Sequence, residues 1–259
     1  MSRPPRERMR ALVTNDDGIA SPGLHWLAGA ARDAGLDVVV AAPMRESSGS
    51  SAAITAVEEK GRVVVEERSL PALAGIPAYG VAASPAFIAL IATRGAFGDP
   101  PDIVLSGVNR GANIGKAVLH SGTVGAALTG NAYGCRAMAV SLDVGLSPAG
   151  PPHWSTAGEF VATLLPLLMD ADEPLVLNLN VPDLPPDQVR GLRRGTLADF
   201  GAVQTNIAEQ GQGFVRVTIA DTGAELEPGT DAAWLADRYA SVTPLQPMCE
   251  ADKAILPQL

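Results

Sequence analysis

The feature of the sequence that most limits its fold is a compact strand–helix–strand pattern near the beginning. Short apolar runs at Arg10–Thr14 and Asp37–Ala42 flank a segment that opens at Pro22 and repeats its apolar residues with helical spacing. A helix between two strands this close in sequence is typical of a βαβ unit, in which the strands are parallel and the crossover is right-handed. The chain therefore begins as an α/β protein.

The alternation of strand and helix continues along most of the chain. Each further element is bounded by Gly, Pro or a cluster of polar residues. In chain order we predict a helix at Ser84–Thr93, a strand at Asp102–Ser106, a helix at Thr123–Tyr133, a strand at Ala137–Leu142, a helix at Thr156–Met169 and a strand at Leu175–Leu179. This succession predicts an α/β fold with a doubly wound, mostly parallel sheet in a three-layer sandwich.

The sequence pattern changes after Pro182. Residues 200–230 are rich in glycine and lack helical periodicity, apart from an alternating strand at Phe214–Ile219, and an earlier hairpin is predicted at Val57–Glu67. We therefore expect three regions along the chain. They are a flexible N-terminal tail at 1–9, a core at 10–185, and a β-rich arm with the C-terminal segment at 186–259, packed on the core and used in oligomerisation.

Charge and composition argue against several classes of partner. The chain has 28 acidic and 19 basic residues, and the resulting net charge of −9 repels nucleic-acid backbones and anionic lipid. Cys135 and Cys249 form no C-x-x-C pair, and no long apolar segment follows the basic first residues as in a secretory signal. We expect a cytoplasmic protein with no nucleic-acid polymer and no membrane as its partner.

Polar side chains follow three of the predicted strands, where an open α/β sheet binds its ligand. Asp16 and Asp17 follow the first strand, the segment Ser47-Ser48-Gly49 follows the second, and Asn109 and Asn113 follow the strand at Asp102–Ser106. Adjacent carboxylates resist joint ionisation unless a cation lies nearby, and a set of oxygen donors favours Mg²⁺, Mn²⁺ or Ca²⁺. The alternative is structural: Asp16 caps the next helix and Asp17 forms a turn at Gly18.

A second motif is His120-Ser-Gly-Thr-Val-Gly-Ala-Ala127, which precedes a helix of small residues. Ser121, Gly122 and Thr123 combine hydroxyl groups with the backbone N–H groups of a helix start, which together can bind phosphate. The simpler alternative is that Ser121 or Thr123 only caps the helix. A phosphate site beside a metal site would be an arrangement for phosphoryl transfer.

Several competing motifs are missing or incomplete. The first strand-to-helix turn contains no G-x-G-x-x-G, and Gly111–Lys116 is one residue too short for a Walker motif. No G-x-S-x-G elbow occurs, and the sequence NDDG does not match the D-x-D of an aspartyl-phosphate mechanism, so water is the expected nucleophile. His120 is a candidate proton donor, with a structural or peripheral role as the alternative. Arg110 and Lys116 are candidates for attracting an anionic substrate, with solvent exposure as the alternative.

Taken together, six segments resemble the survival protein E (SurE) family of nucleotidases in order and spacing. They read VTNDDGIASPG, VVVAAPMRESSGSS, PDIVLSGVNRGANIG, HSGTVGAALTG, LNLNVPDLP and SVTPL. The resemblance implies a Rossmann-like catalytic core at 10–185, arms exchanged between subunits of a homodimer or homotetramer, and metal-dependent hydrolysis of nucleoside 5′- and 3′-monophosphates.

The resemblance also implies roles for individual residues. It places one divalent metal ion, Mg²⁺ or Mn²⁺ and in a crystal also Ca²⁺, on Asp16, Asp17, Ser48 and Asn109. It places the substrate phosphate on Asn113, Ser121, Gly122 and Thr123. Asp16 would in addition act as the catalytic residue that orients the attacking water.

The chain departs from the family pattern at a few positions. Phe87 and Ile88 stand where the family commonly has an Asp-Cys pair, and Met44 stands where it often has aspartate. These departures keep open a homologue that binds nucleotide or phosphate without turnover. A dinucleotide-dependent oxidoreductase is a third hypothesis, against which the missing glycine fingerprint argues.

Overall fold

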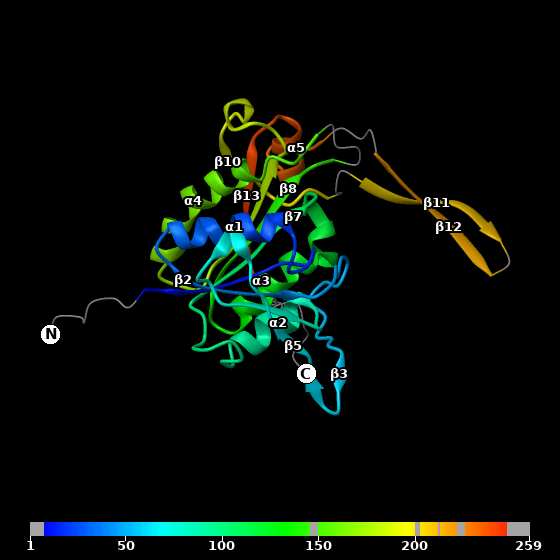
Figure 1. Ribbon diagram of the computed structural model, residues 1–259. Coiled ribbons are helices and arrows are strands. Elements are labelled where there is room, and N and C mark those ends of the chain that lie inside the picture. Colours follow the sequence, from blue (N-terminus) through cyan, green and yellow to red (C-terminus); the bar gives the residue numbers. More distant parts are fainter. Residues whose placement is uncertain (1–7, 146–149, 200–202, 212, 222–225, 248–259) are drawn as a thin grey trace, which may run out of the picture.

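The computed structural model describes residues 8–145, 150–199, 203–211, 213–221 and 226–247 (Figure 1). Within these residues, nine strands form the main sheet. They are β1 (Arg10–Thr14), β2 (Asp37–Pro43), β5 (Val65–Glu67), β6 (Ala78–Val81), β7 (Ile103–Arg110), β8 (Arg136–Asp143), β9 (Val176–Pro182), β10 (Leu192–Arg194) and β13 (Ala240–Leu245). Their order across the sheet is β10-β13-β9-β8-β7-β1-β2-β6-β5.

The central strands of this sheet follow the Rossmann order. From β6 through β2, β1, β7 and β8 to β9 every pairing is parallel, which gives the strand order 3-2-1-4-5-6 when the parallel strands are numbered along the chain. Strands β5 and β13 join antiparallel at the two sides. The chain changes direction between β1 and β7, and the carboxyl ends of these two strands form the switch point at which such sheets bind ligands.

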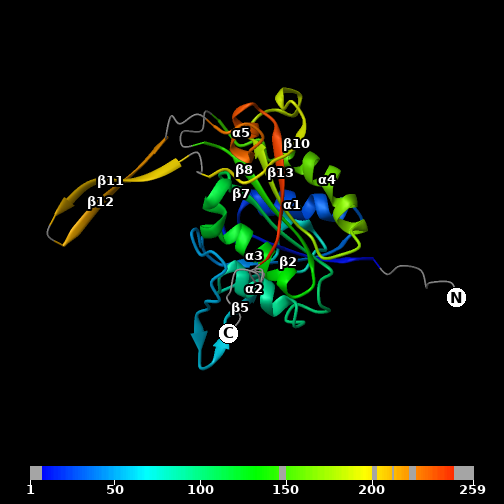
Figure 2. The same ribbon diagram turned by 180° about the vertical axis from the view of Figure 1, so that it is seen from behind.

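Helices cover both faces of the sheet (Figures 1 and 2). Helices α1 (Pro22–Asp33) and α4 (Trp154–Asp170) contribute to one apolar cluster, and α2 (Pro85–Ala92) and α3 (Gly122–Ala132) contribute to another. Alternate residues of β1 enter these clusters, with Ala11 and Val13 in the first and Leu12 in the second. The three-layer, mostly parallel fold predicted from the sequence is confirmed.

Several predicted elements have different bounds in the structure. Strand β7 extends past the predicted end at Ser106 to Arg110, because a bulge lets pairing with β8 resume at Asn109. Gly107 lies in this bulge at a φ of 135°, where an added Cβ atom would be 2.2 Å from the carbonyl oxygen of Val140. The glycine that suggested the end of a strand is instead the residue that allows it to continue.

The short elements outside the helical layers complete the fold. Strands β3 (Glu58–Glu59) and β4 (Arg62–Val63) form the predicted hairpin, and the next strand, β5, joins the main sheet. The remaining elements are η1 (Pro71–Leu73), η2 (Gly115–His120), η3 (Pro186–Gln188), β11 (Val203–Gly211), β12 (Phe214–Asp221) and α5 (Asp231–Ala236). Sequence reasoning did not predict β6, β10, β11, β13, α5 or the 3-10 turns.

Part of the segment after residue 185 adds strands to the main sheet, and another part forms a separate hairpin. Strands β10 and β13 belong to the main sheet, whereas β11 and β12 form an antiparallel hairpin that projects from the body (Figures 1 and 2). Residues 1–7 of the predicted tail lie outside the described residues. No helix in the described part of the chain has the length and apolar character needed to cross a membrane.

Helix α3 packs with unusually little space between it and its neighbours. An added Cβ atom on Gly125 would be 2.2 Å from the carbonyl oxygen of Ser51, and one on Gly130 would be 2.5 Å from a methyl group of Val104. These contacts are far shorter than normal van der Waals separations. The glycines of α3 therefore let the helix lie directly on β7 and on the loop that follows β2.

We expect Gly125→Ala to lower the free energy of unfolding by about 1 to 3 kcal/mol, because the new methyl group overpacks a backbone contact. Gly29→Ala is the matched control, since Gly29 also lies inside a helix but has no atom within 4 Å of the added Cβ position. That substitution should raise the free energy of unfolding by about 0.5 to 1 kcal/mol. Urea unfolding measures both, and similar changes in the two variants would contradict the packing of α3.

Candidate active site

The turn after β1 is shaped by Asn15, whose side chain bonds across it. Its Nδ2 donates to the carbonyl oxygen of Gly18 and its Oδ1 accepts from the Gly18 N–H, both at 3.1 Å. Gly18 has a φ of 98°, which glycine adopts readily. Helix α1 has Ser21 as its N-cap residue, without a side-chain cap. The structural alternative, with Asp16 as cap and Asp17 as turn former, is therefore wrong, because Asn15 makes the side-chain hydrogen bonds of the turn and neither carboxylate takes part in them.

Asp16 is almost fully buried where three segments meet, with 4% of its surface exposed. Its Oδ1 accepts a hydrogen bond from the hydroxyl of Thr123, in the first turn of α3. Its carbonyl oxygen accepts from the N–H of Ser47 at 2.7 Å. Burial raises the pKa of Asp16, and the hydrogen bond from Thr123 lowers it by less. The structure thus brings together the first carboxylate, the loop after β2 and the start of α3.

Gly122 lies against the second oxygen of Asp16. An added Cβ atom at Gly122 would be 2.9 Å from Asp16 Oδ2 and 2.5 Å from the hydroxyl oxygen of Ser50. Ser50 Oγ is buried and has no hydrogen-bond partner among the described residues. Any side chain at position 122 would occupy the space between these oxygens, which explains why the predicted motif has glycine there.

Asp17 is half-buried beside the end of β7. Its Oδ2 accepts a hydrogen bond from the backbone N–H of Arg110 at 3.2 Å, so it lies next to Asn109 in space. Burial and, to a smaller extent, the neighbouring charge of Asp16 raise the pKa of Asp17 from 3.8 to about 6, and the hydrogen bond from the Arg110 N–H opposes this rise. Two carboxylates that both resist ionisation are stabilised by a cation.

The other two predicted metal ligands are Asn109 and Ser48, and their side-chain oxygens differ in the hydrogen bonds that they already form. The Nδ2 of Asn109 donates to the carbonyl oxygen of Gly111 at 2.7 Å, which leaves its Oδ1 as the free acceptor end of the amide. Ser48 is exposed, and its hydroxyl donates to Glu46 Oε1 at 2.7 Å. To contact a metal ion, the Ser48 hydroxyl would have to break its hydrogen bond to Glu46, or keep donating that bond while its oxygen coordinates the ion.

A divalent cation fits this set of residues. Two carboxylates, one amide oxygen and one hydroxyl are hard oxygen donors of the kind that Mg²⁺, Mn²⁺ and Ca²⁺ prefer. In the residues that the structure describes, no group of three or more His, Cys, Asp or Glu side chains is placed to hold a metal ion. The predicted set contains only two such residues and depends on Ser48 and Asn109 for its remaining oxygens.

The predicted phosphate-binding residues divide into two groups. Ser121 caps α3, because its hydroxyl accepts from the N–H of Val124 at 3.1 Å, and Thr123 is bonded to Asp16. Asn113 instead lies in a structural network with Asn178 and Asn180, whose side chains both donate to its carbonyl oxygen. The start of α3 therefore adjoins the carboxylates, whereas the polar groups of Asn113 are largely engaged elsewhere.

Asp231 is a supporting residue to which the sequence analysis gave no role. It is fully buried, and its two carboxylate oxygens accept from the backbone N–H groups of Gly115, Ala198 and Ala232 at 2.8 to 2.9 Å. These bonds tie the segment before α3 to α5. In the sequence, the only sign of this role is the Thr-Asp pair at the start of a short helix. That pair indicates a helix start, but it does not indicate that Asp231 bonds to Gly115 and Ala198, which are distant in the sequence.

The remaining candidates lie at the surface or in the core. His120 is exposed, and Lys116 forms an exposed ion pair with Asp199 at 2.9 Å. Phe87 is half-buried in α2, and Ile88 is fully buried among the apolar residues beneath that helix. The Phe-Ile departure is therefore at least partly a matter of core packing.

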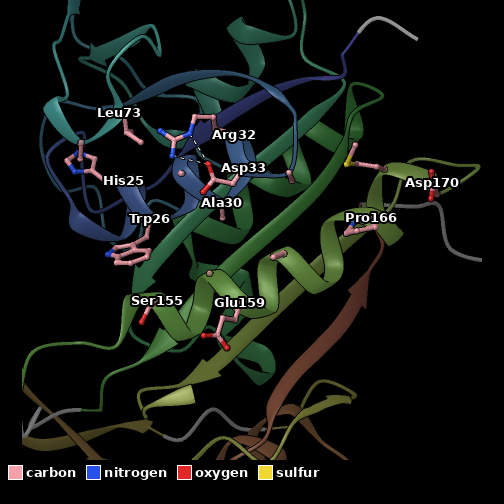
Figure 3. A pocket seen from close by; sticks show the side chains of 16 residues that line it. His25, Trp26, Ala30, Arg32, Asp33, Leu73, Ser155, Glu159, Pro166 and Asp170 are labelled. Atoms are coloured by element: carbon pink, nitrogen blue, oxygen red, sulfur yellow. Dashed lines mark hydrogen bonds and ion pairs between the residues drawn. The ribbon is translucent and has the colours of Figure 1, made fainter. Parts of the chain in front are cut away.

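Two cavities lie beside different elements of the fold. One, of about 950 Å³, lies between α1 and α4, and Figure 3 shows Trp26, Arg32, Glu159 and Pro166 around it. It shares no lining residue with the loop after β2. The other, of about 680 Å³, is lined by Ser47–Ser50 of that loop, whose backbone contacts Asp16. The second cavity is the one that adjoins the candidate site.

Fold and site together define a Rossmann-like α/β protein with a set of oxygen donors beside a helix start, at the switch point of its sheet. The family model described as Survival protein SurE matches residues 11–203. The chain belongs to the SurE family, and the resemblance inferred from its motifs is confirmed.

Relatives and a solved structure agree with this assignment. The chain is 36% identical over 245 residues to the 5′/3′-nucleotidase SurE of Shigella dysenteriae, with 92% of this chain and 90% of the relative covered. It is 38% identical over the same length to the enzyme of that name from Edwardsiella ictaluri, with equal coverage. The crystal structure of the SurE protein from Aquifex aeolicus superposes with a TM-score of 0.72 at 27% identity, covering 92% of this chain and 93% of that one.

The raised pKa of Asp17 predicts how the stability of the metal-free protein depends on pH. The folded protein keeps a proton on Asp17 up to about pH 6, whereas the unfolded chain releases it near 3.8. The contribution of Asp17 to the free energy of unfolding is therefore fully present below pH 3.8 and is lost as the pH rises through about 6.

We expect the melting temperature of wild type minus that of Asp17→Asn, measured by calorimetry in EDTA, to fall as the pH rises from 3.8 to about 6. A difference that does not change with pH would contradict the burial of Asp17. Addition of Mn²⁺ should oppose the fall in wild type, because a cation favours the ionised carboxylate.

Proposed function

We propose that this protein is a nucleotidase that hydrolyses nucleoside 5′- and 3′-monophosphates to nucleoside and phosphate with the help of one divalent metal ion. The observation that carries the proposal is the buried Asp16, held by Thr123 of α3 next to Asp17 at the switch point of the sheet. The relatives that carry the name 5′/3′-nucleotidase SurE support the reaction.

Asp16, Asp17, Ser48 and Asn109 are the residues that would hold the metal ion. When bound, a divalent cation supplies positive charge that makes a water molecule a better nucleophile and offsets the charge of the phosphoryl oxygens. The Asp16 oxygen that does not accept from Thr123 is free to orient the water and accept its proton.

The start of α3 would bind the phosphate. Ser121 uses its hydroxyl to cap Val124, and the first N–H groups of an α-helix have no partner inside the helix. The N–H groups of Gly122 and Thr123 and the positive end of the helix dipole therefore attract an anion. Water then attacks phosphorus, the bond from phosphorus to the ester oxygen breaks, and the nucleoside leaves as the alcohol after taking up a proton.

The assembly and location of the protein are part of the proposal. The projecting hairpin of β11 and β12, together with the SurE resemblance, supports a homodimer or a homotetramer in which this arm contacts another subunit. Burial raises the pKa of the Cys135 thiol to about 11, which keeps it protonated and unreactive. A cytoplasmic location agrees with such a free, buried cysteine.

Phosphate release from nucleoside monophosphates, measured with Mn²⁺, with Mg²⁺ and with EDTA, tests the proposal. Wild type should release phosphate only with a metal, and Asp16→Asn should lower kcat/KM by about a hundredfold or more, since it removes both a ligand and a base. Asp33→Asn is the matched control, because Asp33 is an exposed carboxylate at the end of α1 and should leave the rate unchanged.

Circular dichroism must show that each variant is folded. Absence of release with every metal, from folded wild-type protein, would refute the nucleotidase and leave a nucleotide-binding homologue as the explanation.

A further inference from the structure

The two hydroxyl groups of the predicted phosphate motif are already engaged within the protein. A hydroxyl carries one proton, and that of Thr123 is donated to Asp16 Oδ1, so its side chain has no proton left for an anion. The Ser121 hydroxyl is held in place by the N–H of Val124, which it accepts at 3.1 Å. A further side-chain donor for a phosphate at the start of α3 would therefore come from another segment.

The hydroxyl of Ser50, in the loop after β2, lies at this end of α3. Its oxygen is 2.5 Å from the position that a Cβ atom on Gly122 would occupy, and Asp16 Oδ2 is 2.9 Å from the same position. Gly122 is the first residue of α3, and the Cα–Cβ bonds of an α-helix are tilted toward its N-terminus. Ser50 Oγ therefore lies on the N-terminal side of Gly122, toward which the free N–H groups of the first turn also point.

The Ser50 hydroxyl is unpartnered. Its oxygen is buried and has no hydrogen-bond partner among the described residues. A buried hydroxyl without a hydrogen bond lowers stability, and such a group calls for an explanation, of which a functional role is one. The residue as a whole is only half-buried, so rotation about χ1 can turn its hydroxyl toward a bound molecule. Ser50 can thus gain from a ligand the partner that it lacks in the protein.

The backbone on both sides of Ser50 is fixed. Its N–H donates to the carbonyl oxygen of Ser47 at 3.2 Å, and its carbonyl oxygen accepts from the N–H of Ala53 at 3.0 Å. The next residue, Ser51, donates its hydroxyl to the carbonyl oxygen of Leu119 at 2.7 Å, just before α3 begins. These bonds hold the loop against the start of α3 before any ligand arrives, so little ordering of the loop would be needed on binding.

We propose that Ser50 is a phosphate-binding residue whose hydroxyl donates a hydrogen bond to a phosphate oxygen of the substrate at the start of α3. This inference rests on the proposed nucleotidase function and adds to its phosphate site a residue outside the motif at 121–123. The negative charge of the phosphate strengthens such a bond. Because the bond forms in the substrate complex and in the transition state alike, it acts on substrate binding rather than on the chemical step.

The experiment removes this hydroxyl and, as a matched control, another one from the same loop. Ser50→Ala is compared with Ser47→Ala, because the Ser47 hydroxyl donates to the carbonyl oxygen of Arg45 at 3.4 Å and its residue contacts Asp16 only through the backbone N–H. Calorimetry measures the binding of inorganic phosphate with Mg²⁺ and with EDTA. Steady-state kinetics give KM and kcat for AMP, and urea unfolding is measured without ligand.

We expect Ser50→Ala to weaken phosphate binding and to raise KM for AMP by about tenfold, with kcat within about twofold of wild type. The urea midpoint of Ser50→Ala should equal or exceed that of wild type, because the hydroxyl that it removes has no hydrogen bond to lose. All values for Ser47→Ala should stay within about twofold of wild type.

Unchanged phosphate affinity in Ser50→Ala, or no phosphate binding to folded wild-type protein, would overturn the assignment. A lower urea midpoint with unchanged affinity would show that the hydroxyl is structural, and a lower kcat with unchanged affinity would make Asp16 its partner in place of the phosphate. Weaker phosphate binding in Ser50→Ala, from a protein that hydrolyses no ester, would instead refute the nucleotidase and leave Ser50 as a phosphate-binding residue.

Discussion

The burial of the Asp16 carboxylate is the constraint on which the rest of the site depends. A carboxylate removed from water is costly unless hydrogen bonds or a cation stabilise its charge. In this chain the Thr123 hydroxyl bonds to one of its oxygens, and Gly122 lets the start of α3 approach the other. The N–H of Ser47 in the loop after β2 bonds to the backbone carbonyl oxygen of the same residue, Asp16. The end of β1, the loop after β2 and the first turn of α3 therefore meet at this single residue.

Much of the fold could be predicted because its signals are local. Apolar runs and helical spacing identified β1, α1 and β2, and the repeated alternation identified the parallel sheet. Strand β13 gave no such signal, because Pro244 argues against a strand that has neighbours on both sides. The structure tolerates Pro244 because β10 pairs only with Ala240–Val242 and leaves that side of β13 free beyond them.

The site was predictable to the extent that its residues follow strands. Asp16 and Asp17 follow β1, and the rule for ligands in open sheets places them at the switch point without further information. The engagement of Asn113 with Asn178 and Asn180 was not predictable, because it joins residues more than sixty positions apart. The unpartnered Ser50 and the buried Asp231 were missed for the same reason, since their surroundings exist only after the chain has folded.

The position of β13 in the sheet also bears on how the protein remains free of aggregation. Strand β9 is buried along its whole length and pairs with β8 on one side and with β13 on the other. Without β13 its apolar residues would form an open strand edge, which is the kind of surface on which β-sheet proteins associate with one another. The residues that complete this edge come about sixty positions later in the sequence. The segment at Ala240–Leu245 therefore protects the sheet from edge-to-edge association, although it lies far along the chain from the residues of the site.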